Sequence, residues 1–99
     1  MKTPIDIIKW DEKNTIYFYR VSSARLTSDF YLGIDSQKKK VYFFDSSNFL
    51  KMLGFIDFSK ADYFIKIPEI DQGILNLVAI KVFKAMQENK FPQDLSILP

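Results

Sequence analysis

Neither cysteine nor histidine occurs among the 99 residues of this chain. The absence of cysteine excludes disulfides, cysteine nucleophiles and thiolate zinc sites, and the absence of histidine excludes an imidazole base and a serine–histidine relay. Glycine is scarce, with three residues in all, and none of them belongs to a phosphate-binding glycine motif. We therefore expect no cofactor, no metal site and no catalytic activity.

A long apolar run and a large net charge are also missing. The longest uncharged apolar stretch covers residues 74–80, whereas about 20 residues are needed to cross a bilayer. The N-terminal segment contains Asp6 and Lys9 and has no run of signal-peptide type. The 14 lysines and arginines nearly balance the 12 aspartates and glutamates. Since 47% of the residues are hydrophobic, we expect a single folded domain over residues 1–99 that is cytoplasmic and not membrane-bound.

Several segments rich in β-branched and aromatic residues predict strands. Four of them are joined by short polar connections and cover residues 5–10, 15–22, 29–35 and 40–45. Connections this short imply antiparallel neighbours, because a parallel return needs a dozen or more residues. A fifth short strand is expected over residues 62–67.

Two other segments have helical spacing of their apolar residues. Residues 47–53 predict a short helix ended by Gly54, and residues 55–58 are ambiguous. The stronger helix covers residues 72–89, follows Asp71 as a cap, and places these residues on one stripe: Leu75, Val78, Ala79, Val82, Phe83 and Met86. The sequence therefore predicts an α+β fold, in which a mainly antiparallel sheet of four or five strands has the long C-terminal helix packed on one face.

Alternation along the strands sorts their side chains onto two faces. One consistent arrangement places these residues under the long helix: Ile16, Phe18, Phe30, Leu32, Ile34, Val41 and Phe43. The other face then carries four of the five tyrosines: Tyr17, Tyr19, Tyr31 and Tyr42. Tyrosine is enriched at interface cores, so this face is predicted to bind a partner. Two alternatives remain: residues 47–67 and the tail cover this face, or its tyrosines face solvent without a partner.

Charged residues suggest a second hypothesis for the function, nucleic-acid binding. The run Lys38–Lys40 lies beside aromatic residues, as in modules that stack RNA or DNA bases. The strand reads KKKVYFFD, however, and lacks both glycines of the RNA-recognition pattern. We favour a solvated hairpin loop and keep nucleic-acid binding as the alternative. Asp57 and Asp62 match no calcium loop, and we expect them to help orient a protein partner.

The aromatic strands and the segment GFIDFSKADYFIKIPEID, which runs into the terminal helix, resemble small immunity proteins of bacterial toxin systems. Members of such families are single α+β domains that bind and block a cognate toxin. The resemblance implies a non-catalytic, toxin-neutralising protein whose partner is a toxin domain. A second copy of the chain is the other partner that we consider for the tyrosine face.

Overall fold

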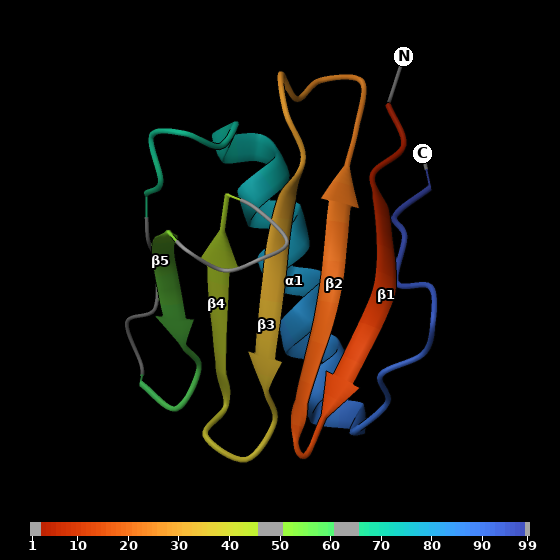
Figure 1. The fold of residues 1–99 in the computed structure, drawn as a ribbon, viewed down its shortest axis with the longest axis vertical. Helices are drawn as coiled ribbons and strands as arrows, with labels where there is room; N and C mark the ends of the chain where they lie inside the picture. The colour runs from red at the N-terminus through yellow and green to blue at the C-terminus, as the bar shows by residue number, and fades with distance from the viewer. Residues whose placement is uncertain (1–2, 46–50, 61–65, 99) are drawn as a thin grey trace.

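The computed structural model describes residues 3–45, 51–60 and 66–98. In these ranges the elements, in chain order, are β1 (Asp6–Lys13), β2 (Ile16–Ser22), β3 (Phe30–Asp35), β4 (Lys40–Phe44), β5 (Met52–Asp57) and α1 (Gln72–Glu88). The strands form one sheet in the order β1-β2-β3-β4-β5, and each pair of neighbours is antiparallel (Figure 1). The predicted α+β class and antiparallel sheet are confirmed.

Two tight turns join β1 to β2 and β3 to β4. Asn14 lies between β1 and β2 with a φ of 55°, and asparagine tolerates this left-handed conformation better than most residues. Lys39 has the same φ in the turn between β3 and β4. The buried Asp35 closes that turn, because its carboxylate oxygen accepts a hydrogen bond from the backbone N–H of Lys38 at 3.1 Å. The run of lysines therefore belongs to a tight hairpin turn.

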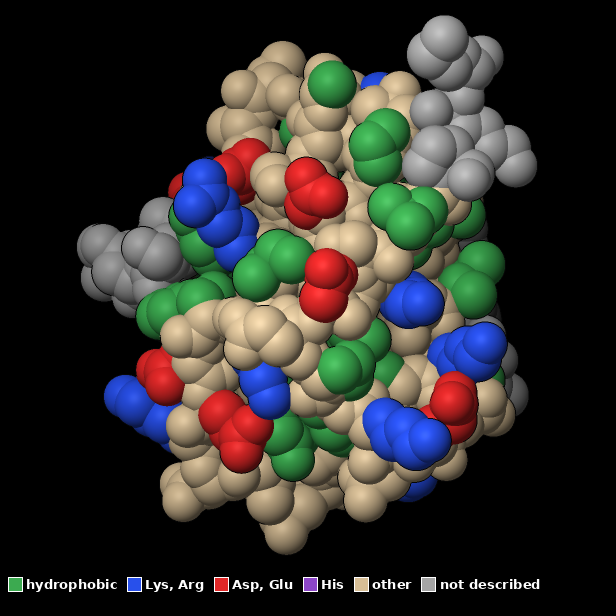
Figure 2. All heavy atoms as spheres, turned by 90° about the vertical axis from the view of Figure 1, so that its right-hand side faces the viewer, with side chains coloured by type: hydrophobic (Ala, Val, Ile, Leu, Met, Phe, Trp, Pro, Cys, Tyr) green, Lys and Arg blue, Asp and Glu red, His purple; other side chains and the backbone are tan. Residues whose placement is uncertain are grey.

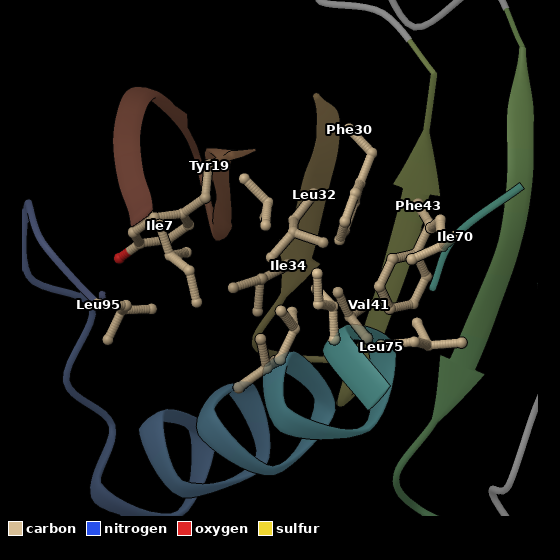
Figure 3. Close-up of a cluster of buried hydrophobic side chains, with 14 of the residues drawn as sticks. Ile7, Tyr19, Phe30, Leu32, Ile34, Val41, Phe43, Ile70, Leu75 and Leu95 are labelled. Carbon is tan, nitrogen blue, oxygen red and sulfur yellow. The ribbon is translucent and has the colours of Figure 1, made fainter. Parts of the chain in front are cut away.

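The hydrophobic core contains side chains from the sheet and from α1. We call the side of the sheet that contributes to this core the inner face, and its fully buried members include Ile7, Tyr19, Val21, Leu32, Ile34, Val41 and Phe43. From α1 come Ile74, Leu75, Val78 and Val82, which belong to the same cluster. Figure 3 shows the labelled inner-face side chains directed toward the helix. The opposite side of the sheet, called the outer face below, contributes little to this core.

Helix α1 begins and ends close to its predicted limits. The carboxylate of Asp71 accepts a hydrogen bond from the backbone N–H of Ile74 at 3.0 Å, as expected for an N-cap. Asn89 ends the helix in the left-handed conformation. Ile80, which lies outside the predicted apolar stripe, is 66% exposed. Within the described residues, no helix has the length and apolar character needed to span a membrane.

The C-terminal segment, residues 91–97, returns along β1 (Figure 1). Ile5 and Ile97 exchange two backbone hydrogen bonds of 3.0 and 2.8 Å, and the N–H of Leu95 donates to the carbonyl of Ile7 at 2.8 Å. An unpaired edge strand is a template for unwanted association with other chains. This segment satisfies backbone groups from Ile5 to Lys9, at the start of β1, that would otherwise present such an edge. No sequence pattern had predicted it.

One predicted element is corrected, and another lies mostly outside the described residues. Part of the expected helix over residues 47–53 lies outside the described residues, and its end is wrong because Met52 and Leu53 belong to β5. Gly54 is paired with Phe43 within the sheet and caps no helix. Most of the strand expected over residues 62–67 also lies outside the described residues. Periodicity alone does not distinguish a short apolar strand from a turn of buried helix, which explains the error at β5.

Candidate protein-binding surface

The four tyrosines predicted to share one face are divided between the two faces of the sheet. Tyr31 and Tyr42 lie on the outer face, whereas Tyr17 and Tyr19 alternate toward the inner face. Tyr19 is paired with the buried Leu32, and directly paired residues of neighbouring strands share a face. The expectation of a common tyrosine face is therefore wrong for the two residues from β2.

The two inner tyrosines contact the segment that follows α1, at Phe91 and Pro92. Tyr19 is fully buried, and its hydroxyl donates a hydrogen bond of 2.6 Å to the carbonyl of Pro92. Burial raises the pKa of the Tyr19 phenol well above its ordinary value. The ring of Tyr17 stacks on Phe91, with centroids 4.2 Å apart and planes inclined by 10°. The ammonium group of Lys9 donates to the carbonyl of Phe91 at 2.9 Å. These contacts give both tyrosines a structural role, and we leave them out of the candidate surface.

The outer face carries a row of aromatic and aliphatic side chains that extends from β1 to β5. Its members are Ile8, Trp10, Phe18, Tyr31, Tyr42, Phe44, Met52 and Phe55. Trp10 lies 5.9 Å from Phe18 and 6.4 Å from Tyr31 between ring centroids, and Tyr42 lies 6.1 Å from Phe55. These ring contacts join β1 to β2 and β3, and β4 to β5. The rings of Phe18 and Phe44 both lie over Gly33, which connects the two parts into one surface.

The two ends of this row are the parts most open to solvent. Trp10 on β1 is 44% exposed, and Phe55 and Met52 on β5 are 45% and 51% exposed. Phe18 and Tyr42 are half-buried on either side of Gly33, with which both are paired. Large exposed apolar side chains that gather on one face are typical of binding surfaces.

The cations of the outer face have acidic neighbours. A terminal guanidinium nitrogen of Arg20 lies 2.6 Å from a carboxylate oxygen of Asp29. Lys40 is paired across the sheet with Asp57, and its ammonium nitrogen lies 5.6 Å from the ring centroid of Phe55. Because these charges compensate each other, the face has no strong field of one sign.

Of the two carboxylates that were predicted to orient a partner, Asp57 and Asp62, only the first lies within the described residues. Asp57 lies at the end of β5, where its carboxylate accepts hydrogen bonds from the hydroxyl and backbone N–H of Ser59. These bonds, more than the nearby lysines, lower the pKa of Asp57. Asp62 lies outside the described residues. Asp57 thus closes a turn at the border of the outer face, from where it also compensates Lys40.

Four aromatic members of the row, Trp10, Phe18, Phe44 and Phe55, were absent from the predicted site. The first follows Lys9 at a β-bulge, where the pairing of β1 with β2 shifts by one residue. Arg20 provides a signal that would have identified Phe18, because residues two apart in a strand share a face and a lone charged residue marks the solvent side. Phe55 lies in the segment that had been left ambiguous.

Other parts of the surface show weaker features. On the side formed by β1 and the C-terminal segment, acidic and basic side chains are interspersed with hydrophobic ones (Figure 2). In the described ranges, no group of three or more potential ligands is arranged to hold a metal ion. Lys38 and Lys39 are exposed at the hairpin turn. Comparison of the chain with family models, with curated proteins and with solved structures finds no match.

Proposed function

We propose that this chain is a non-catalytic protein-binding domain that binds its partner through the outer face of the sheet. The row of aromatic side chains from Trp10 to Phe55 carries the proposal, because both of its ends are exposed although the rings are large and apolar. Tryptophan and tyrosine dominate the binding energy of many protein interfaces. In this proposal α1 packs on the inner face and leaves the outer face to the partner.

The size of the outer face fits the centre of an interface. Five strands spaced by about 4.8 Å, with about 20 Å of length each, give a face of ~400 Å². Each partner contributes about 800 Å² to a protein interface of standard size. The aromatic row would therefore form the apolar centre of the contact, and the surrounding charged residues would form its polar border.

The charge distribution favours a protein over a nucleic acid. An aromatic sheet with nearby lysines is suited to base stacking, but affinity for a phosphate backbone depends on cations that can neutralise phosphates. Arg20 is bound to Asp29, and Lys40 faces Asp57. Nucleic-acid binding through Lys38–Lys40 is the alternative, and a steep loss of affinity with salt would be its signature.

The most concrete form of the proposed function is neutralisation of a toxin. A rigid sheet face that blocks the active site of another protein needs no catalytic group of its own. The support for this form is the α+β sheet with an apolar outer face, together with the resemblance of residues 54–71 and the following helix to immunity proteins. The expected partner is then a toxin domain with a complementary apolar patch.

The test compares two double variants that each remove two exposed hydrophobic side chains. Trp10→Ser with Phe55→Ser alters the outer face, and Leu77→Ser with Ile80→Ser alters the exposed side of α1 as a matched control. A partner retained from cell extract by the wild type is purified and titrated against all three proteins by calorimetry. We expect a loss of affinity of about tenfold or more for the outer-face variant alone. Equal affinity in both variants would refute the proposal.

Three further measurements identify the kind of partner. Co-expression with the wild type, but not with the outer-face variant, should restore growth of cells that produce the partner, if the partner is a toxin. Light scattering after size exclusion should show a monomer, and a dimer that the outer-face variant disrupts would instead assign this face to a second copy of the chain. Binding of single-stranded RNA with a steep salt dependence would favour the nucleic-acid alternative.

A further inference from the structure

A pocket opens on the outer face where β1 pairs with β2. It has a volume of about 350 Å³ and is lined by Asp6, Ile8, Trp10, Arg20 and Ser22. The pairing of the two strands explains this grouping, because Asp6 lies opposite Ser22 and Ile8 lies opposite Arg20. The volume is at the lower end of the range for small-molecule sites, about 300–1,000 Å³, so a single side chain of a partner fits it better than a cofactor does.

The pocket has one negative charge that the described residues leave uncompensated. Arg20 is engaged by Asp29, whose carboxylate accepts from Nε at 2.7 Å and lies 2.6 Å from Nη2. Asp6 is exposed, and no cation in residues 3–45, 51–60 and 66–98 forms an ion pair with it. Two carboxylates and a single guanidinium therefore give the pocket and its border one net negative charge. This charge repels an entering anion and attracts an entering cation.

Trp10 adds a second reason for a cationic occupant. Its indole is 44% exposed, and contacts with Phe18 and Tyr31 hold it on the sheet. Indole is the aromatic ring that attracts cations most strongly. A carboxylate and an indole in one pocket are the combination that suits a planar guanidinium, which stacks on a ring and bonds to a carboxylate at the same time.

We infer that this pocket receives an arginine side chain of the partner protein. The inference rests on the proposed function and adds to it the chemistry of one anchoring residue. The guanidinium would stack on Trp10 and pair with Asp6, while Ile8 would contact the aliphatic part of the side chain.

Trp10 is the only tryptophan of the chain, so its fluorescence and its indole N–H resonance report on this pocket alone. We would titrate the protein with N-acetyl-arginine amide and with N-acetyl-citrulline amide, an uncharged molecule of nearly the same shape, at constant ionic strength. The arginine compound should shift the indole resonance with a saturable dependence in the millimolar range, on the order expected for a single side chain. The citrulline compound should not.

Asp6→Asn should weaken binding of the arginine compound by about three- to fivefold, the size of an exposed ion pair. Glu69→Gln removes the same charge from a residue outside the pocket and should leave binding unchanged. Thermal unfolding of both variants confirms that they fold. The inference is wrong if citrulline binds as well as arginine does, or if Asp6→Asn retains full affinity.

The two proposals fail in different ways. If the arginine compound does not bind but the outer-face double variant still loses the partner, the arginine inference is overturned and the proposed function stands. If the compound binds as expected but the double variant retains the partner, the proposed function is overturned. In the complex, Asp6→Asn should lower partner affinity by a factor similar to that seen with the compound, and an unchanged affinity would place the arginine elsewhere.

Discussion

Replacement of Tyr19 by phenylalanine removes one hydroxyl group and keeps the buried ring. The hydroxyl donates to the carbonyl of Pro92 at 2.6 Å, and the net contribution of such a hydrogen bond is about 0.5–1.5 kcal/mol. Pro92 is exposed, so water can replace the lost donor and no penalty for an unsatisfied carbonyl is added. We expect Tyr19→Phe to lower the free energy of unfolding by about 1 kcal/mol, which corresponds to a fall in Tm of roughly 4–8 °C for a domain of this size.

Tyr31→Phe is the matched control, because it removes the same atom from the outer face. Its free energy of unfolding should stay within about 0.5 kcal/mol of the wild type. Urea unfolding measures both variants, and equal slopes would show that only stability has changed. Amide hydrogen exchange should also be faster at Leu95 and Ile97 in Tyr19→Phe, because the hydroxyl fastens the C-terminal segment. Equal stability of the two variants would refute the structural role assigned to Tyr19.

The stabilities of the wild type and of Tyr19→Phe should converge at alkaline pH. Burial, followed by the charges of Glu12 and Tyr17, raises the pKa of the Tyr19 phenol above the ordinary value of about 10. The folded state then holds this proton more tightly than the unfolded state, so the stabilisation is complete below about pH 10 and is lost as the pH rises further. Since phenylalanine does not titrate, the stability difference between the wild type and Tyr19→Phe should shrink above that pH. A constant difference from pH 7 to pH 11 would contradict this reasoning.

Four other substitutions test the packing, the helix cap and the sheet edge. A Cβ at Gly54 would lie 3.2 Å from Cδ1 of the buried Ile67, so Gly54→Ala should cost about 1–3 kcal/mol in urea unfolding. Gly33→Ala should change stability by less than about 0.5 kcal/mol, because its nearest contact would be an ordinary 3.4 Å. Hydrogen bonds from the start of α1 lower the pKa of Asp71, so the stabilisation by this carboxylate is lost as the pH falls below about 4. The Tm of Asp71→Asn should therefore depend less on pH between 6 and 2.5 than the Tm of the wild type. Circular dichroism measures both. Ile97→Pro removes an N–H that donates to the carbonyl of Ile5, directly before β1, and should cause concentration-dependent self-association in light scattering. A protein that stays monomeric would argue against the role of this segment in protecting the edge.

Local signals in the sequence were sufficient for most of the elements. The first four strands and α1 lie within a few residues of their predicted positions, because alternation, helical spacing and the Asp71 cap depend only on neighbouring residues. The prediction of a helix over residues 47–53 was wrong at its end, because a short apolar run contains too few repeats to distinguish a helix from a strand. The C-terminal segment gave no signal, since its pairing with β1 joins residues from the two ends of the chain.

The assignment of faces failed at β2 for a different reason. Apart from Arg20 and Ser22, both sets of alternating residues in this strand are apolar or aromatic, so hydrophobicity alone does not indicate which set is buried. The pairing between strands settles the question, and it places Tyr19 and Val21 in the core. Arg20 was the one residue of β2 whose charge indicated the outer side, and it implied the same arrangement.

Aromatic residues of β2 hold the C-terminal segment on the inner side, whereas Trp10 lies exposed on the outer face. This division limits how a partner could bind near β1. Tyr17 and Tyr19 hold the C-terminal segment, which satisfies backbone groups along the first half of β1, up to Lys9. A strand from another protein would have to displace that segment before it could extend the sheet at this edge. If the proposed function holds, binding near β1 depends on side chains of the outer face, where Trp10 is the most exposed ring. It follows that partner affinity should respond strongly to Trp10→Ser and weakly to Tyr19→Phe, even though Tyr19→Phe has the larger effect on the stability of the C-terminal segment.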